Sequence, residues 1–147
     1  MFKNILVPTD GSKRSMATMN KAVEYAKSTG ARLVFFYAKP DPRFELYGET
    51  MLVDPRALEN FGSMAEEHAQ KVLATCTSLA QAEGVASTAV TTSASAVFEA
   101  IIAAANASNC DLIFMASHGR RGVAALLLGS ETQKVLTHST IPVLVFR

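Results

Sequence analysis

Residues 114–133 read FMASHGRRGVAALLLGSETQ, and this stretch joins the end of a strand to the start of a helix through a glycine-rich connection. Its first letters close an apolar run that begins at Leu112. A short continuous apolar run is typical of a strand covered on both faces, as in a parallel sheet. Its last letters, from Gly129 to Gln133, combine a glycine with polar residues that open helices. The stretch therefore predicts one strand–loop–helix unit of an α/β fold.

The same alternation of strand and helix patterns extends along the whole chain. Short runs rich in apolar and β-branched residues predict five strands, at residues 5–7, 33–37, 85–91, 112–115 and 143–146. Apolar residues at three- and four-residue spacing predict helices between them, around residues 16–26, 58–79, 98–105 and 135–136. Asp54 followed by Pro55 is a start signal for the second helix. The order predicts a single three-layer domain over residues 1–147, with a doubly wound, five-stranded parallel sheet and helices on both faces.

The composition indicates a compact protein and argues against two classes of partner. Of 147 residues, 49% are hydrophobic and 18% are charged, with 14 Lys and Arg against 13 Asp and Glu. This near-neutrality argues against a nucleic-acid binder driven by bulk charge, although it leaves room for a local basic patch. The apolar run 123–128 is too short to span a bilayer. Residues 1–4 lead straight into the first strand, so we expect no signal peptide and a cytoplasmic protein, in which Cys76 and Cys110 are buried free thiols.

Ligands of open α/β sheets bind beyond the carboxyl ends of the strands. Three connections are expected there, at residues 8–12, 38–40 and 116–129. The last gives the clearest signal, because Gly119 and Gly122 lack a Cβ and let the backbone approach a ligand. Gly129 then precedes a helix whose first amides have no partner within the helix and can bind phosphate. The same residues permit a second interpretation, since Ser130 and Gln133 match a capping box that needs no ligand.

Other sequence features leave a role open or argue against known kinds of site. Residues 39–53 form a long connection, which is either a binding loop or a variable surface excursion. The chain contains neither Gly-x-Gly-x-x-Gly nor the P-loop motif, which argues against a conventional dinucleotide dehydrogenase or P-loop NTPase. His118 has no marked nucleophile or orienting carboxylate, and His68 and His138 lack the spacing of metal ligands. We therefore assign no catalytic residue and no metal ligand.

The chain resembles the universal stress protein family, from ILVPTDGS at residues 5–12 to IPVLV at residues 141–145. Nucleotide-binding members of that family carry Gly-x-x-Gly, nine further residues and then Gly-Ser or Gly-Thr. Here the motif reads ASHG at residues 116–119, nine residues and then Gly129-Ser130, so that Ala116 replaces the first glycine. The resemblance implies a Rossmann-like fold of the adenine nucleotide alpha hydrolase type and a bound ATP or AMP, with Mg²⁺ held, if present, through the phosphates.

The resemblance also implies a role for each matching residue. The loop after the first strand would border the adenosine, with Asp10 bonding the nucleoside, and the backbone of Ala38 would read the adenine edge. Residues after the fourth strand would line the ribose and phosphates, and the start of the last helix would supply amides or hydroxyls to the phosphates. The implied nucleotide-binding residues are Pro8, Thr9, Asp10, Ala38, Met115, Ala116, His118, Gly119, Gly129, Ser130, Glu131 and Thr132.

Three of these residues keep a second interpretation on residue type alone. Asp10 is equally suited to an Asx-turn that closes the first loop. Ala116 would weaken binding if its position needed a positive φ or lay against a phosphate, and would be tolerated if it only ended the fourth strand. The Glu131 carboxylate is expected to point to solvent, where it favours the helix N-terminus, rather than toward a phosphate.

The resulting expectation is a stress-response sensor or regulator that binds an adenine nucleotide and hydrolyses ATP slowly at most. The alternative belongs to another class, a protein-interaction module of the same fold that binds no nucleotide. The resemblance further implies a homodimer that pairs the last strand, residues 143–146, across a two-fold axis. An unpaired apolar edge strand gives such pairing a physical reason.

Overall fold

The computed structural model describes residues 1–43, 54–117 and 128–147, and its strands form one five-stranded sheet in the order β3-β2-β1-β4-β5. Each pair of neighbouring strands in this sheet runs parallel. The strands are β1 (Asn4–Pro8), β2 (Arg32–Pro40), β3 (Ser87–Ala94), β4 (Leu112–Ala116) and β5 (Val143–Phe146). The predicted fold class is confirmed.

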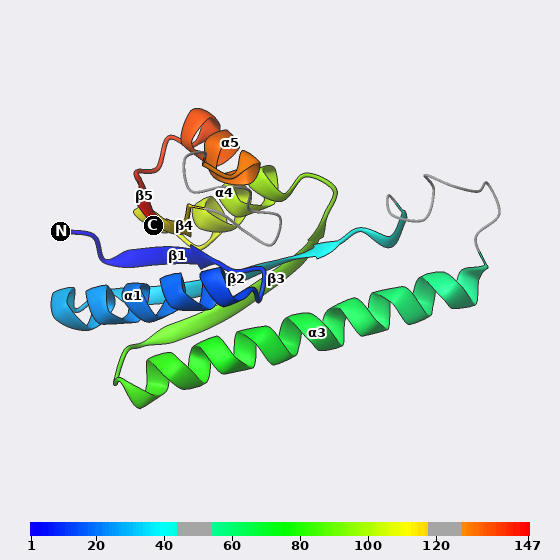
Figure 1. The fold of residues 1–147 in the computed structure, drawn as a ribbon, viewed down its shortest axis with the longest axis horizontal. Helices are drawn as coiled ribbons and strands as arrows, with labels where there is room; N and C mark the ends of the chain where they lie inside the picture. Colours follow the sequence, from blue (N-terminus) through cyan, green and yellow to red (C-terminus); the bar gives the residue numbers. More distant parts are fainter. Residues whose placement is uncertain (44–53, 118–127) are drawn as a thin grey trace.

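The helices cover both faces of the sheet. Those described are α1 (Lys13–Thr29), α3 (Pro55–Ala82), α4 (Val97–Ala107) and α5 (Ser130–His138). Figure 1 shows α1 and α3 on one face and α4 and α5 on the other. One buried cluster joins the sheet to α1 and α3, and a second joins it to α4 and α5. The sheet is therefore the middle of three layers.

Successive residues of the central strand enter opposite cores. Ile5 and Val7 of β1 belong to the cluster with α1 and α3, whereas Leu6 belongs to the cluster with α4 and α5. All three side chains are 0% exposed. Because both faces of the strand are buried, its sequence shows a continuous apolar run in place of an apolar–polar alternation.

Two of the helix starts are fixed by local hydrogen bonds. The Ser12 side chain caps α1 by accepting from the Ser15 amide at 3.2 Å. The Asp54 side chain caps α3 by accepting from the Arg56 amide at 3.0 Å, and Pro55 is the first helical residue. The helix start predicted from Asp54 and Pro55 is confirmed. It could be predicted because the capping contact involves only residues within one helical turn of each other.

The third strand begins later than its apolar pattern indicated. Gly84 has a left-handed φ of 71°, and the Val85 amide donates to the Ala80 carbonyl at 2.9 Å. Val85 is buried and lies just after α3, where an apolar residue commonly packs against the last turn of a helix that ends at a glycine. β2 in turn runs on to Pro40, so that Lys39 belongs to the strand rather than to the connection that follows. Residues 44–53 of that connection lie outside the described residues.

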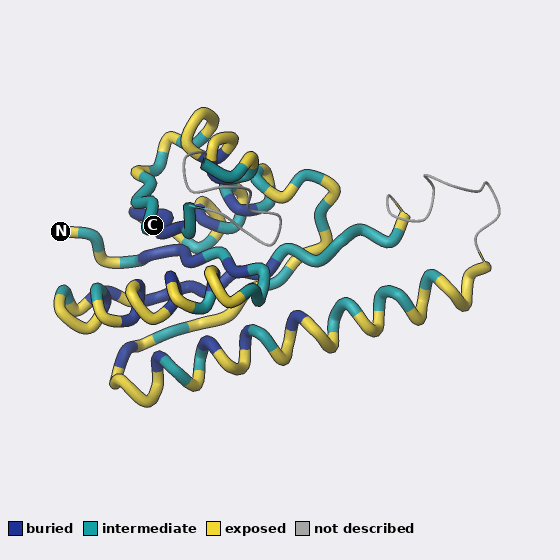
Figure 2. Tube along the Cα trace, viewed as in Figure 1, coloured by how far each residue is buried: buried dark blue, intermediate teal, exposed yellow. Residues whose placement is uncertain are grey.

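The long helix α3 is anchored through its C-terminal half. Its buried residues are Ala69, Leu73, Cys76 and Ala80. Figure 2 shows these dark positions confined to the part of α3 that lies along the sheet. The N-terminal half carries side chains such as Phe61 and Met64, which are half-buried and 72% exposed respectively. The C-terminal half therefore supplies the packing that holds the helix on the sheet.

We expect two glycine-to-alanine substitutions to change stability in opposite directions. Gly11 has a φ of +75°, and a Cβ there would lie 2.9 Å from Cγ2 of Val72 on α3. Gly11→Ala should lower the free energy of unfolding by about 1–2 kcal/mol, because a left-handed backbone strains an L-residue. Gly62→Ala, inside α3 with no atom within 4 Å of the added Cβ, should raise it by about 0.5–1 kcal/mol.

Equilibrium urea unfolding of the two variants and the wild type measures both changes. Equal effects of the same sign would contradict the assignment of a strained turn at Gly11 and an ordinary helical position at Gly62.

Candidate functional site

The candidate site lies beyond the carboxyl ends of β1 and β4, because the helices that follow these two strands lie on opposite faces of the sheet. These strands are neighbours, paired at Ile5 with Leu112 and at Leu6 with Ile113. After β1 the chain enters α1 on one face, whereas the helix after β4, α5, lies on the other face. Divergence of this kind opens a crevice at the carboxyl edge of a parallel sheet, which is the usual ligand position in doubly wound folds.

The loop after β1 is held by its own polar side chains. Thr9 is 8% exposed, with its hydroxyl 2.6 Å from the Ser15 hydroxyl and accepting from the Gly11 amide at 3.1 Å. Asp10 accepts from the Ser12 amide through Oδ1 at 2.9 Å, which confirms the Asx-turn interpretation. Pro8 is the last residue of β1. The loop therefore brings a half-buried carboxylate to the edge of the sheet in a fixed position.

β2 continues past the end of β1, and this difference in length affects Ala38. The β1–β2 pairing ends at Pro8 and Phe36, and the Thr9 amide donates to the Phe36 carbonyl at 2.8 Å. Backbone groups of alternate residues in a strand point to the same side. The N–H and C=O groups of Ala38 therefore point in the direction of those of Phe36, toward the side where β1 has ended.

Ala116 occupies an ordinary strand position. It is the last residue of β4 and pairs with Phe146 of β5. Asn109 is the single non-glycine residue with positive φ in the described part of the chain, so Ala116 needs no left-handed backbone. Met115, before it, is 6% exposed and packs in the cluster with α4 and α5. The replacement of the first motif glycine therefore causes no backbone strain.

The start of α5 is bonded directly to the end of β4. The Gly129 amide donates to the Ser117 carbonyl at 2.8 Å, and the Thr132 hydroxyl donates to the Ala116 carbonyl at 3.0 Å. The first amide of α5 with a helical partner is that of Gln133, which donates to Gly129 at 3.0 Å. The amides of residues 130–132 therefore have no acceptor within the helix.

The capping-box interpretation of this helix start is wrong. Gly129 is the N-cap residue and Ser130 the first helical residue, and the N-terminus of α5 has no side-chain cap. Ser130 cannot act as the N-cap residue, because it is the first residue of the helix and its own backbone is already helical. The hydrogen bond from the Gly129 amide to the Ser117 carbonyl, just after β4, holds Gly129 at the N-cap position.

The expectation that Glu131 points to solvent is also wrong. Its Oε2 accepts from the Phe98 amide of α4 at 2.9 Å, and its Oε1 accepts from Lys134 at 3.0 Å. Ala96, the N-cap residue of α4, provides no side-chain hydrogen bond, so Glu131 supplies an acceptor to that helix start from another helix.

Two of the predicted nucleotide-binding residues, His118 and Gly119, lie outside the described residues. Across residues 1–43, 54–117 and 128–147, no three His, Cys, Asp or Glu side chains gather as a metal site requires. Within the same ranges no helix is long and apolar enough to cross a membrane. Cys76 and Cys110 are free and buried as predicted, and desolvation raises the pKa of each thiol to about 11.

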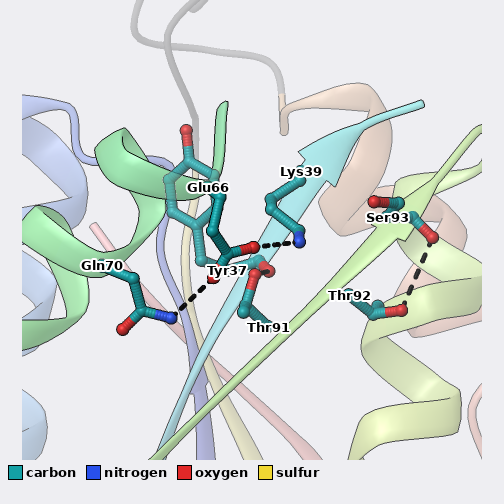
Figure 3. A network of polar contacts seen from close by, with 7 residues as sticks. All are labelled: Tyr37, Lys39, Glu66, Gln70, Thr91, Thr92 and Ser93. Atoms are coloured by element: carbon teal, nitrogen blue, oxygen red, sulfur yellow. Dashed lines mark hydrogen bonds and ion pairs between the residues drawn. The ribbon is translucent and has the colours of Figure 1, made fainter. Parts of the chain in front are cut away.

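Sequence reasoning missed a polar network beside Ala38. Figure 3 shows Lys39 of β2 facing Glu66 of α3, with which it forms an ion pair. Gln70 donates to the second oxygen of Glu66 at 2.8 Å, and the Thr91 hydroxyl of β3 donates to the Tyr37 carbonyl at 2.9 Å. Lys39 and Glu66 are 27 residues apart, so their partnership depends on tertiary structure. The network ties α3 to β2 next to the candidate site.

The fold is that of a doubly wound α/β protein, and the ends of β1 and β4 form its candidate ligand position. The family model of the universal stress protein family matches residues 1–147. The chain belongs to this family. A universal stress protein of Thermus aquaticus, encoded in the QAH/OAS sulfhydrylase 3′ region, is 34% identical over 152 residues, with 100% of both chains covered.

Solved structures of the family share the fold. Universal stress protein UspA from Lactobacillus plantarum matches with a TM-score of 0.80 at 21% identity, covering 99% of this chain and 97% of the other. A universal stress protein in complex with cAMP matches at 0.67 and 20% identity, with 99% and 97% covered. One from Archaeoglobus fulgidus in complex with dAMP matches at 0.69 and 16% identity, with 99% and 98% covered.

We expect the contribution of Glu66 to stability to disappear in acid. The side-chain hydrogen bond from Lys39, followed by that from Gln70, lowers the pKa of Glu66 below its ordinary value. A carboxylate with a lowered folded-state pKa stabilises the fold above its unfolded-state pKa and loses this effect as the pH falls through the folded value. Glu66→Gln should therefore be less stable than wild type at pH 7, and the difference should shrink steadily below about pH 4.5.

Urea unfolding at a series of pH values measures the difference, with Glu24→Gln as the control, because Glu24 pairs with Lys21 one turn away in α1. A Glu66→Gln difference that is constant from pH 7 to pH 3 would contradict the ion-pair assignment.

Proposed function

We propose that this protein binds an adenine nucleotide at the carboxyl edge of its sheet and acts as a stress-response sensor or regulator. The observation that carries the proposal is the start of α5, where the amides of residues 130–132 are held against the end of β4. Amides without helical partners, at the positive end of a helix dipole, suit the phosphate groups of a nucleotide. Ser130, Glu131 and Thr132 would contribute these donors, and Gly129, whose own amide is bonded to Ser117, would let the phosphate approach the backbone because it lacks a Cβ.

The nucleoside would lie between the loop after β1 and the projecting part of β2. The Ala38 backbone, directed past the end of β1, offers one donor and one acceptor, which is the pattern that an adenine edge can pair with. The Asp10 carboxylate, held at the same edge, is our candidate for contact with the ribose. Pro8 and Thr9 would border the adenosine, and Met115, Ala116, His118 and Gly119 would line the ribose and phosphates.

The relatives support this ligand class. One family member has been solved with cAMP and another with dAMP, and both contain an adenine base and a phosphate. ATP or AMP would satisfy the same contacts, and Mg²⁺ could accompany ATP through its phosphates. We assign no catalytic base, so hydrolysis of ATP would be slow at most. We also propose one domain over residues 1–147 and a cytoplasmic location, which the two buried free thiols support.

We further propose a homodimer formed through β5. This strand lies at an edge of the sheet and consists of four apolar residues that are all half-buried. The Ser117 amide donates to Phe146 and the Ile113 amide donates to Pro142, so backbone groups of even-numbered residues face β4. By alternation, those of Val143 and Val145 face outward. An apolar edge with outward-facing ladder groups favours pairing with a second copy.

Nucleotide binding can be tested through Gly129. Its φ of −59° suits any residue, so Gly129→Val should fold but should place a branched side chain where the phosphate approaches. We expect this variant to lose saturable ATP and AMP binding, while Ala116→Gly binds as well as wild type or better. Isothermal titration calorimetry up to millimolar nucleotide measures both, and the supernatant of denatured wild-type protein is analysed for bound nucleotide.

Wild-type protein without co-purified nucleotide and without saturable binding would contradict the proposal and favour the interaction module that binds no nucleotide. Normal binding by Gly129→Val, with circular dichroism confirming its fold, would instead show that the phosphate site has been misplaced.

The dimer can be tested with a proline that spares the sheet. Val145→Pro removes an outward-facing N–H, whereas Leu144→Pro removes one that faces β4. We expect Val145→Pro to be folded and monomeric by sedimentation velocity, and Leu144→Pro to lose stability. A dimeric Val145→Pro, or a monomeric wild type at micromolar concentration, would exclude pairing through β5.

A further inference from the structure

Glu131 joins the first turns of two helices that start from different strands. Its Oε2 accepts from the Phe98 amide, which belongs to the first turn of α4, at 2.9 Å. Its own backbone belongs to the first turn of α5, the turn with the phosphate-binding amides of the proposed function. The carboxylate thus satisfies a donor of one helix start while its backbone forms the other.

The contact continues along one face of α5. Lys134 donates to Oε1 of Glu131 at 3.0 Å, and its ammonium lies 5.5 Å from the centre of the Phe98 ring. The His138 ring lies 5.1 Å from the same ring. Residues 131, 134 and 138 follow helical spacing, so a single face of α5 holds both the backbone and the ring of Phe98.

The direction of the Glu131 side chain matters for an anion site. A carboxylate in the first turn of a helix occupies the positive end of the dipole and would compete with a phosphate for it. Here the Glu131 carboxylate is bound by the Lys134 ammonium and by the Phe98 amide at the start of α4, so its side chain is directed toward Phe98. Bonds from α5 to Ala116 and Ser117 fix the other side of the same turn.

We propose that Glu131 is a positioning residue of the nucleotide site, which fixes the first turn of α5 against α4 and couples phosphate binding to the start of α4. This inference rests on the proposed function. It differs from a direct ligand role, because the carboxylate acts through the Phe98 amide and not on the nucleotide.

Two substitutions of Glu131 separate positioning from charge. Glu131→Gln keeps an oxygen acceptor for the Phe98 amide and removes the negative charge, whereas Glu131→Ala removes both. We expect Glu131→Ala to raise the Kd for ATP by about threefold to tenfold, as the loss of a helix-capping contact would, and Glu131→Gln to restore a Kd within about twofold of wild type. The matched control is Glu24→Ala, which breaks an exposed i,i+3 pair with Lys21 on α1.

Calorimetry is performed well below the unfolding temperature of every variant, and amide hydrogen exchange is followed at Phe98. In the wild type, ATP should slow exchange at Phe98 more than at Ser108, at the other end of α4, and this difference should be absent in Glu131→Ala. A purely structural role would lower the unfolding temperature and leave the Kd and this ATP-dependent protection unchanged.

Each outcome decides the question. Rescue by Glu131→Gln together with ATP-dependent protection at Phe98 supports the positioning role. Nucleotide binding with equal Kd values for wild type and Glu131→Ala, or tighter binding by both variants, overturns it while leaving the proposed function intact. If the wild type binds no ATP, the proposed function is overturned and the positioning role with it. This holds even if hydrogen exchange at Phe98 is faster in Glu131→Ala than in the wild type.

Discussion

The burial of β1 on both faces is the constraint on which the rest of the structure depends. Its residues feed two separate cores, so the helices must lie in two layers, one on each side of the sheet. Because β1 ends at Pro8 while β2 continues to Pro40, a short central strand is flanked by a longer neighbour. β2 therefore projects beyond the carboxyl end of β1 on one side. The strand that organises the core also ends at the candidate site.

At the candidate site, the fold offers backbone groups more than side chains. The loop after β1 directs the Thr9 hydroxyl inward, and the end of β4 accepts bonds from Gly129 and Thr132. In the proposed function, donors for an anion would come from the main chain of α5, and the donor and acceptor for a base would come from the main chain of Ala38. A site of this kind would depend on the relative placement of strands and helices, and the Glu131 carboxylate links the first turn of α5 to the start of α4.

The features that sequence could predict are those fixed within about one turn or one strand. The apolar runs located all the strands, and Asp54 with Pro55 located the start of α3. Failures occurred where a distant partner decides. Ser130 matches a capping box, but the Ser117 carbonyl places the N-cap at Gly129. Val85 is apolar and close to a strand, but its amide donates to the Ala80 carbonyl in the last turn of α3. The contact between Glu131 and Phe98 was missed because the two residues are 33 positions apart in the sequence.

The burial of the two thiols has a consequence for the redox chemistry of the protein. With a pKa of about 11, each cysteine is ionised in only about one molecule in ten thousand at neutral pH, and the thiolate is the species that peroxides attack. The chain contains no other cysteine. The two cysteines of the folded protein are therefore poor targets for oxidants, and oxidation of the folded chain would fall first on exposed thioethers such as that of Met64, which is 72% exposed.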